Sequence, residues 1–337
     1  MPPVRLLITQ DFPRPLLDEI AAVSPRIALE VRPARKAEDL PSELLAETEI
    51  LYTSTALPIP TAAPKLKWVQ CHHAGIDHLA EHPLLKSAVQ VTTLSGAHAS
   101  QMAEYALMMM LALGHHLPHL LEYQSRSEWP ASRWELFSPN ELRGATLGIV
   151  GYGTIGREVA RLARAFGMEV LAVKRDAMYP ADRGYMPDGL GDASGDLLRR
   201  LYPPQALRSM LADCDYVLAA VPLSPQTRNL IGEAEFRAMK KSAVFINVAR
   251  GGVVDENALV EALRSGRIAG AALDVFAEEP LPTDSPLWSL PNVIVTPHIS
   301  GISRNYDKRA VAVFNENLRR YLAGEELLNL YDREQGY

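Results

Sequence analysis

The chain has 337 residues, more than a single domain usually contains, so two domains are expected. Its residues are 47% hydrophobic and 22% charged, as in an ordinary globular protein, and a net charge of -6 argues against a nucleic-acid or anionic-membrane partner. The two cysteines, Cys71 and Cys214, lack metal-binding spacing and are too few for a disulfide scaffold, which favours a cytoplasmic protein without a metal cofactor.

The N-terminal part of the chain alternates short apolar strands with helical stretches, which indicates a small parallel α/β unit. Strands are predicted at residues 4–8, 27–31, 50–53 and 66–70, with a helix at 13–23 after the first of them. A strongly apolar helix follows at 102–113, and its run Met108–Met110 is interpreted as core packing. The apolar run 106–113 is too short to span a bilayer and no signal peptide is expected, so no membrane partner is predicted.

A glycine fingerprint follows a polar, aromatic segment at 125–140. It lies between an apolar strand at 146–150 and a helical pattern that continues to Phe166. In such a turn the first glycine permits the tight bend, the second lets a pyrophosphate approach the backbone, and the third lets helix and strand pack closely. Phosphate then meets the N–H groups at the helix N-terminus. The fingerprint therefore predicts dinucleotide binding by Gly151, Gly153, Thr154, Ile155 and Gly156.

The alternation of strands and helices resumes after the fingerprint. Strands are predicted at 169–174, 216–220, 244–248, 269–274 and 293–296, and helices at 255–264 and 310–322. Between 176 and 204 the chain is rich in Gly, Pro and Asp and lacks an apolar period, which predicts a long surface excursion. The leucine-rich segment after the last helix is expected to pack on the first domain.

Five motifs with ordered positions stand out in the chain from the fingerprint onward. They occupy residues 144–156, 222–227, 246–252, 273–280 and 296–298. Together they closely resemble the D-isomer-specific 2-hydroxyacid dehydrogenases, and the resemblance is dense from about Gly75 to His298. It implies an α/β protein with a Rossmann NAD(P)-binding domain at 113–299, inserted into a flavodoxin-like substrate-binding domain at 1–112 plus 300–337. The active site would lie in the cleft between the two domains.

The resemblance implies a catalytic trio of Arg250, Glu279 and His298. Arg250 follows a strand end, where open α/β sheets bind ligands, and its guanidinium can clamp a substrate carboxylate and polarise the adjacent carbonyl. His298 would bind the carbonyl oxygen, protonate it during reduction and take the proton back during oxidation. Glu279 would fix the tautomer of that imidazole. Glu278 is a rival for this role, but Glu279 aligns with the family acid directly before Pro280.

A loop in the first domain, at 73–77, resembles the family's loop for the substrate carboxylate. The small residues Ala74 and Gly75 would let backbone N–H groups face the anion. The adjacent pair His72 and His73 could shape substrate choice, although two histidines in a loop are more often solvated.

The type of residue that ends the second strand of the Rossmann domain indicates whether the protein binds NAD or NADP. NAD enzymes usually carry an acidic residue there, which binds the ribose 2′-hydroxyl. This chain has Lys174 and Arg175, two cations suited to a 2′-phosphate, so NADP(H) is favoured. NAD(H) stays possible if both cations point to solvent and Asp176 holds the ribose. Other cofactor contacts implied by the resemblance are Val221, Pro222, Thr227, Val248, Ala249 and Asp274, the last with a helix N-cap as its alternative role.

These features predict an oxidoreductase that transfers a hydride between NAD(P)H and a small 2-oxo acid, with the D-2-hydroxy acid as the reduced product. Glyoxylate- and hydroxypyruvate-like acids are the first expectation for the substrate. An NAD(H)-sensing, corepressor-like binding protein of the same fold is the alternative, because such proteins keep the same trio. A homodimer is expected, with the helix at 105–113 and the segment Trp129–Trp134 as the interface.

Overall fold

The computed structural model describes residues 2–182 and 184–336, which fold into two compact α/β units. The first unit extends to His98, takes in a short segment that ends at Pro187, and resumes at Ser303. The second unit contains residues 99–182 and 188–302. One unit is therefore inserted into the sequence of the other, as the family resemblance implies.

The sheet of the first unit has five parallel strands in the order β2-β1-β3-β4-β5, which is the flavodoxin-like order. The strands are β1 (Val4–Ile8), β2 (Ile27–Val31), β3 (Ile50–Thr53), β4 (Trp68–Cys71) and β5 (Gln90–Thr92). The four predicted strands are confirmed within a few residues. β5 was not predicted, because its sequence Gln-Val-Thr contains a single apolar residue.

Three helices accompany this sheet: α1 (Arg14–Ala21), α2 (Ser42–Glu47) and α10 (Tyr306–Ala323). α10 packs its apolar face on the sheet, where the Phe314 ring lies 4.9 Å from that of Tyr52 and 5.3 Å from that of Trp68, centroid to centroid. The segment after α10 returns to the sheet edge, where Tyr331 N–H donates to the Val91 carbonyl oxygen at 2.8 Å. The expected packing of this segment on the first unit is confirmed.

The second unit has seven parallel strands in the order β12-β11-β10-β9-β6-β7-β8. They are β6 (Thr146–Val150), β7 (Glu169–Val173), β8 (Arg200–Tyr202), β9 (Tyr216–Ala219), β10 (Val244–Asn247), β11 (Gly270–Leu273) and β12 (Val293–Val295). The order reverses between β6 and β9, as in a Rossmann sheet, so the fingerprint after β6 stands at the topological switch point. The predicted fold class is confirmed.

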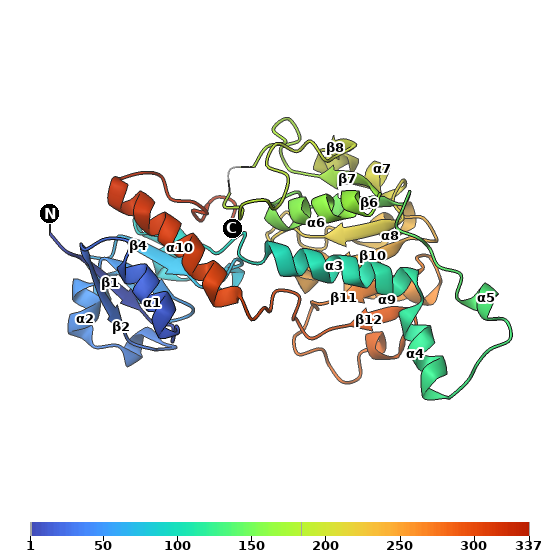
Figure 1. Ribbon diagram of the computed structural model, residues 1–337, viewed down its shortest axis with the longest axis horizontal. Helices are drawn as coiled ribbons and strands as arrows, with labels where there is room; N and C mark the ends of the chain where they lie inside the picture. Colours follow the sequence, from blue (N-terminus) through green and yellow to red (C-terminus); the bar gives the residue numbers. More distant parts are fainter. Residues whose placement is uncertain (1, 183, 337) are drawn as a thin grey trace. The chain divides into compact units, whose positions relative to one another are not determined.

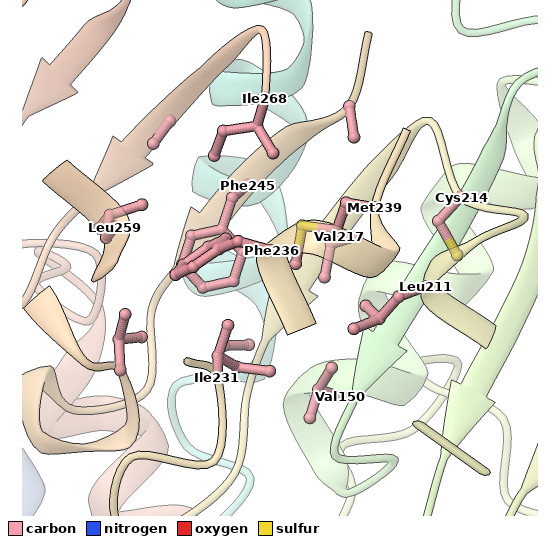
Figure 2. Packing of buried hydrophobic residues seen from close by; sticks show 14 of the residues in the cluster. Val150, Leu211, Cys214, Val217, Ile231, Phe236, Met239, Phe245, Leu259 and Ile268 are labelled. Carbon is pink, nitrogen blue, oxygen red and sulfur yellow. The ribbon is translucent and has the colours of Figure 1, made fainter. Parts of the chain in front are cut away.

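Helices cover both faces of the second sheet (Figure 1). The helices on the sheet are α3 (Ala99–Gly114), α6 (Thr154–Ala165), α7 (Leu207–Leu211), α8 (Glu233–Ala238) and α9 (Glu256–Arg264), whereas α4 (Leu117–Ser125) and α5 (Arg133–Leu136) extend away from it. One core cluster includes Phe236 and Phe245, whose rings meet edge to face at 5.6 Å (Figure 2). The other lies under α3 and α6, which run side by side. The two apolar layers hold the strand ends in place.

Helix α3 accounts for the main difference between the predicted domain boundaries and the observed units. The second unit begins at Ala99, whereas the resemblance suggested 113. α3 belongs to this unit because its buried face packs along α6. Met109 and Met110 are buried as predicted, but Met108 is 52% exposed, since one turn of helix cannot direct three consecutive side chains to the same side. The interpretation of Met108 as core was wrong.

The predicted surface excursion at 176–204 is more structured than expected. β8 lies within it and pairs in parallel with β7, from Leu171–Arg200 to Val173–Tyr202. Its middle contributes to the first unit, where Tyr185 N–H donates to Asn329 Oδ1 at 3.1 Å. The apolar pattern missed these features because polar side chains and backbone groups hold much of the segment.

Candidate active site

The glycine turn after β6 fits a dinucleotide phosphate. Gly151 has φ +104°, and a Cβ there would lie 2.6 Å from the Ala220 carbonyl oxygen. A Cβ on Gly156 would lie 2.5 Å from the Gly151 carbonyl oxygen, so both positions require glycine. At Gly153 nothing lies within 4 Å of a Cβ, which leaves open space at the start of α6. The exposed backbone at this helix N-terminus is the cradle that a pyrophosphate needs.

The two cations after β7 have different environments. Lys174 is half-buried, and its ammonium donates to the carbonyl oxygens of Tyr179 at 2.5 Å and Ala181 at 2.8 Å. Burial lowers the pKa of Lys174. Arg175 is exposed at the strand end, while Asp176 accepts the Met178 N–H at 3.2 Å. Lys174 therefore holds the following loop, and Arg175 is the cation that remains exposed.

The other predicted cofactor residues lie on the loops after β9 and β10. Val221 borders the glycine turn, with Cγ1 2.7 Å from the Cβ position of Gly151. The Thr227 hydroxyl donates to the Pro222 carbonyl oxygen at 2.6 Å and so closes its own loop. Val248 and Ala249 are buried directly after β10. Because all strands are parallel, these loops share one edge of the sheet with the glycine turn.

Arg250 lies on a turn that is stabilised by the buried side chain of Asn247. Asn247 Oδ1 accepts the Ala249 N–H at 3.0 Å, and its Nδ2 donates to the Arg250 carbonyl oxygen at 3.3 Å. A Cβ on Gly251 would lie 1.8 Å from the backbone of Phe276, so only glycine allows this close approach. The tight packing joins the Arg250 turn to the loop that follows β11.

His298 and Glu279 form a hydrogen-bonded pair, with Nδ1 of the imidazole 2.7 Å from Oε2 of the carboxylate. The other carboxylate oxygen accepts the Phe276 N–H at 3.1 Å, which orients Glu279. The two side chains are 47% and 36% exposed. A carboxylate can only accept here, so Nδ1 carries the proton and Nε2 is the nitrogen that can exchange one with a ligand. The structure pairs His298 with Glu279, as preferred from the sequence over Glu278.

Asp274 stabilises the loop that carries His298. It is fully buried and accepts from the Thr296 hydroxyl at 2.6 Å and from the N–H groups of Ile299 and Ser300 at 2.8 and 2.9 Å. His298 itself has φ +53°, an uncommon conformation that these bonds support. The N-cap alternative for Asp274 was wrong, since the carboxylate caps this loop rather than a helix. Its predicted cofactor contact stays a prediction.

Two residues that stabilise the His298 loop, Tyr105 and Thr296, were not identified from the sequence. The Tyr105 hydroxyl, on α3, is 2.6 Å from the Thr296 hydroxyl, which in turn bonds to Asp274. Burial raises the pKa of Tyr105 to about 12, so it stays protonated at neutral pH. Thr296 lies within a recognised motif, next to Pro297, and this was the available signal. Nothing in the sequence linked the motif to α3.

The histidine pair of the first unit is built into its loop rather than solvated. His72 has a 13% exposed side chain, and its Nδ1 is 2.8 Å from the Tyr52 hydroxyl. Burial lowers its pKa to about 4, so His72 is neutral at physiological pH. His73 Nε2 is 2.6 Å from the Ser54 hydroxyl. The expectation of solvent-exposed histidines was wrong, because β3 and the residue directly after it supply partners to both. The adjacent Ala74 and Gly75 stay predicted carboxylate ligands.

Within residues 2–182 and 184–336, no three His, Cys, Asp or Glu side chains come together as a metal ion would require. No helix in the same ranges has the length and apolar character needed to cross a membrane.

A doubly wound parallel sheet with a dinucleotide turn, an arginine and a histidine–carboxylate pair at its carboxyl edge defines a class of nicotinamide-dependent oxidoreductase folds. Residues 107–300 match the family model described as D-isomer specific 2-hydroxyacid dehydrogenase, NAD binding domain. The chain belongs to the D-isomer specific 2-hydroxyacid dehydrogenase family, as the motifs suggested.

Individual relatives agree with this assignment. Glyoxylate reductase of Korarchaeum cryptofilum is 34% identical over 278 residues, 81% of this chain and 78% of the relative. D-3-phosphoglycerate dehydrogenase of Methanocaldococcus jannaschii is 32% identical over 96% of this chain, which spans only 58% of that relative. The crystal structure of a D-isomer specific 2-hydroxyacid dehydrogenase from Xanthobacter autotrophicus Py2, in complex with NADPH and MES, is 30% identical with a TM-score of 0.80. That similarity covers 99% of this chain and 100% of the other.

Proposed function

We propose that this chain is an NAD(P)H-dependent reductase of small 2-oxo acids, with the D-2-hydroxy acid as product. The observation that carries the proposal is the 2.7 Å hydrogen bond between His298 Nδ1 and Glu279 Oε2. Glu279 and His298 follow β11 and β12, Arg250 follows β10, and the glycine turn follows β6. All four strands are parallel and end at the same edge of the sheet. A cation for the substrate, an oriented imidazole and a nucleotide turn are the three elements that reduction of a 2-oxo acid needs.

Arg250 binds and polarises the substrate. Its planar guanidinium can form two parallel charge-assisted hydrogen bonds with the carboxylate, which lysine cannot do. The positive charge also makes the neighbouring 2-oxo carbon more electrophilic. The Asn247 bonds to the Arg250 turn hold the backbone of this group in place before the substrate arrives.

His298 moves the proton of the reaction. The nicotinamide supplies the hydride when it is bound. His298 Nε2–H donates its proton to the carbonyl oxygen as that oxygen gains negative charge, and recovers it in the oxidative direction. Glu279 accepts the Nδ1–H, which keeps the imidazole in the required orientation.

We infer a preference for NADP(H), with NAD(H) as the second possibility. Arg175 is an exposed cation where NAD enzymes usually have an acidic residue, which suits a 2′-phosphate. Lys174 contributes by holding the loop that follows. The Xanthobacter relative contains NADPH, which supports this preference.

We expect glyoxylate or hydroxypyruvate to be reduced, with kcat/KM about tenfold or more higher for NADPH than for NADH. Several curated relatives are named glyoxylate reductase, which supports small 2-oxo acids as substrates. Steady-state kinetics with both nucleotides and a series of 2-oxo acids of increasing size measures this. Arg175→Ala should lower kcat/KM for NADPH and leave the value for NADH nearly unchanged.

Three outcomes of the assay would change the proposal. A strong preference for NADH contradicts the cofactor assignment. Turnover restricted to large 2-oxo acids contradicts the substrate class. Intact micromolar nucleotide binding without turnover of any 2-oxo acid favours the corepressor-like sensor, whose trio would be the same.

We also propose a homodimer whose interface includes α4 and α5. Trp129 and Trp134 are 85% and 77% exposed, and Leu121 on α4 is 54% exposed, an unusual set of large apolar side chains to leave in water. α3 contributes less than the sequence suggested, because Tyr105 and most of its apolar neighbours are buried within their own unit. Met108 is the exposed exception on that helix.

We expect the protein to have the mass of two chains in light scattering, and Trp129→Ser with Trp134→Ser to shift it toward one chain. The loss of apolar contact area should weaken association without unfolding the chain. Ile59→Ser, at a 53% exposed position of the first unit, is the control that should leave the mass unchanged. A parent protein with the mass of one chain at micromolar concentration would contradict the dimer.

A further inference from the structure

Arg157, on α6, is a completely buried arginine that the proposed reaction does not use. Its guanidinium donates to the carbonyl oxygens of Asp192 and Pro180. Its Nε lies 3.3 Å from Asp182 Oδ2, an ion pair without good hydrogen-bond geometry. Arginine is almost never fully buried unless it is paired in this way, so the site is specifically built. All three partners belong to the excursion after β7.

Tyr152 connects the same excursion to the glycine turn. It stands between the first two glycines of the fingerprint and is 2% exposed. Its ring centroid is 4.5 Å from Arg157 Cζ, and its hydroxyl donates to Asp192 Oδ2 at 2.5 Å. Burial raises the pKa of Tyr152, which keeps this hydroxyl a donor. The residue that nucleotide-binding turns leave variable is thus used here for a specific contact.

Asp192 organises the far side of the excursion. Its Oδ1 accepts the N–H groups of Gly195 and Asp196 at 3.1 and 2.9 Å, and its Oδ2 accepts that of Leu197 at 3.1 Å. One buried carboxylate therefore receives three backbone N–H groups and the Tyr152 hydroxyl. We call Tyr152, Arg157 and Asp192 the anchor network.

Two neighbouring side chains hold the excursion at further points. Glu158 Oε2 accepts the Gly191 N–H at 2.6 Å and is itself paired with Arg161. Lys174, at the end of β7, binds the carbonyl oxygens of Tyr179 and Ala181. The excursion is consequently attached both to α6, behind the pyrophosphate turn, and to the strand end beside Arg175.

We propose that the anchor network is a positioning device that sets the affinity of this protein for its dinucleotide. This inference rests on the proposed function, because it assigns the glycine turn to the pyrophosphate and the strand end at Arg175 to the phosphorylated ribose. The network joins these two parts of the site through the excursion. Without it, the excursion would have to be ordered when the nucleotide binds, which lowers affinity. The reacting groups lie on other loops, so turnover with saturating nucleotide does not depend on it.

The sharpest test is Tyr152→Phe, which deletes the hydroxyl but keeps the ring beside Arg157. We expect the dissociation constant for NADPH, measured by calorimetry or fluorescence without any 2-oxo acid, to rise about tenfold. In the absence of nucleotide, backbone N–H groups of residues 191–197 should exchange with deuterium faster. With saturating NADPH, kcat and the KM for the 2-oxo acid should stay within about twofold of the parent values.

Tyr216→Phe is a matched control in the same unit. Tyr216 is also buried, and its hydroxyl donates to the Asn140 carbonyl oxygen at 3.4 Å, away from the excursion. It should leave NADPH affinity unchanged even if it lowers the melting temperature. A double-mutant cycle adds a second check: Tyr152→Phe should add little to the effect of Asp192→Asn, because both changes disrupt the same Tyr152–Asp192 hydrogen bond.

Two results would overturn the inference. One is faster exchange in Tyr152→Phe with an unchanged dissociation constant, which would make the network structural only. The other is an equal loss of NADPH affinity in Tyr216→Phe, which would assign the effect to general destabilisation. A parent protein that binds NADPH but reduces no 2-oxo acid would contradict the proposed reaction alone and leave the binding test intact.

Discussion

Replacing His298 by alanine is expected to lower kcat for 2-oxo acid reduction by roughly a hundredfold to ten-thousandfold, the usual contribution of a general acid. The variant loses the proton donor for the carbonyl oxygen, while the glycine turn and the anchor network are untouched. NADPH should therefore bind with the parent dissociation constant. Stopped-flow measurement of NADPH oxidation, together with direct nucleotide binding, separates these two quantities.

A substitution of Glu279, the partner of His298, tests the same prediction in a second way. Glu279→Gln removes the negative charge beside Nδ1 and should lower kcat less than His298→Ala does, because the imidazole itself remains. His115→Ala, an exposed histidine of the same unit, is the control and should behave like the parent protein. A His298→Ala variant with nearly parental kcat would refute the assigned acid–base role.

Arg250→Ala is expected to lower kcat/KM for the 2-oxo acid by about a thousandfold, through a higher KM and a lower kcat together. The substrate carboxylate loses its charge-assisted hydrogen bonds, and the carbonyl loses a polarising charge. Initial-rate kinetics at saturating NADPH measures both parameters. The nucleotide dissociation constant should change little.

Arg250→Lys distinguishes charge from geometry. Lysine keeps the positive charge but not the planar fork, so this variant should recover only part of the activity. Arg199→Ala, at a 66% exposed side chain of the same unit, is the matched control and should keep parental kinetics. Full activity in Arg250→Lys would mean that the charge alone matters, contrary to the clamp described here.

Much of the fold followed from the sequence, because local features specify it. Short apolar runs such as 146–150 and 244–248 became strands of a buried parallel sheet, where both faces require apolar side chains. Several of the elements that escaped prediction have little apolar pattern. β5 and β8 contain three residues each, and α4 and α5 place large apolar side chains in solvent rather than in a core.

In the candidate site, too, the features that depend on local geometry could be predicted from the sequence and the others could not. Gly151 and Gly156 could be identified because each is required by its own backbone, either by a positive φ or by close packing. The His298–Glu279 pair could be anticipated only through the family motifs, since 19 positions separate the two residues. Asp274 shows the limit of this approach. Its strand-end position was visible, but its support of the His298 loop depends on how that loop folds back.

By itself, the sequence determined the strand–turn–helix of the nucleotide site, the order of the motifs and the residues that end the strands. These depend on short-range geometry: which residue permits a tight turn, and where an apolar run stops. Only the tertiary structure decided that Lys174 holds a loop, that Met108 faces solvent and that Arg157 is buried against Asp192. Each of those outcomes depends on partners distant in the sequence, which no local pattern specifies.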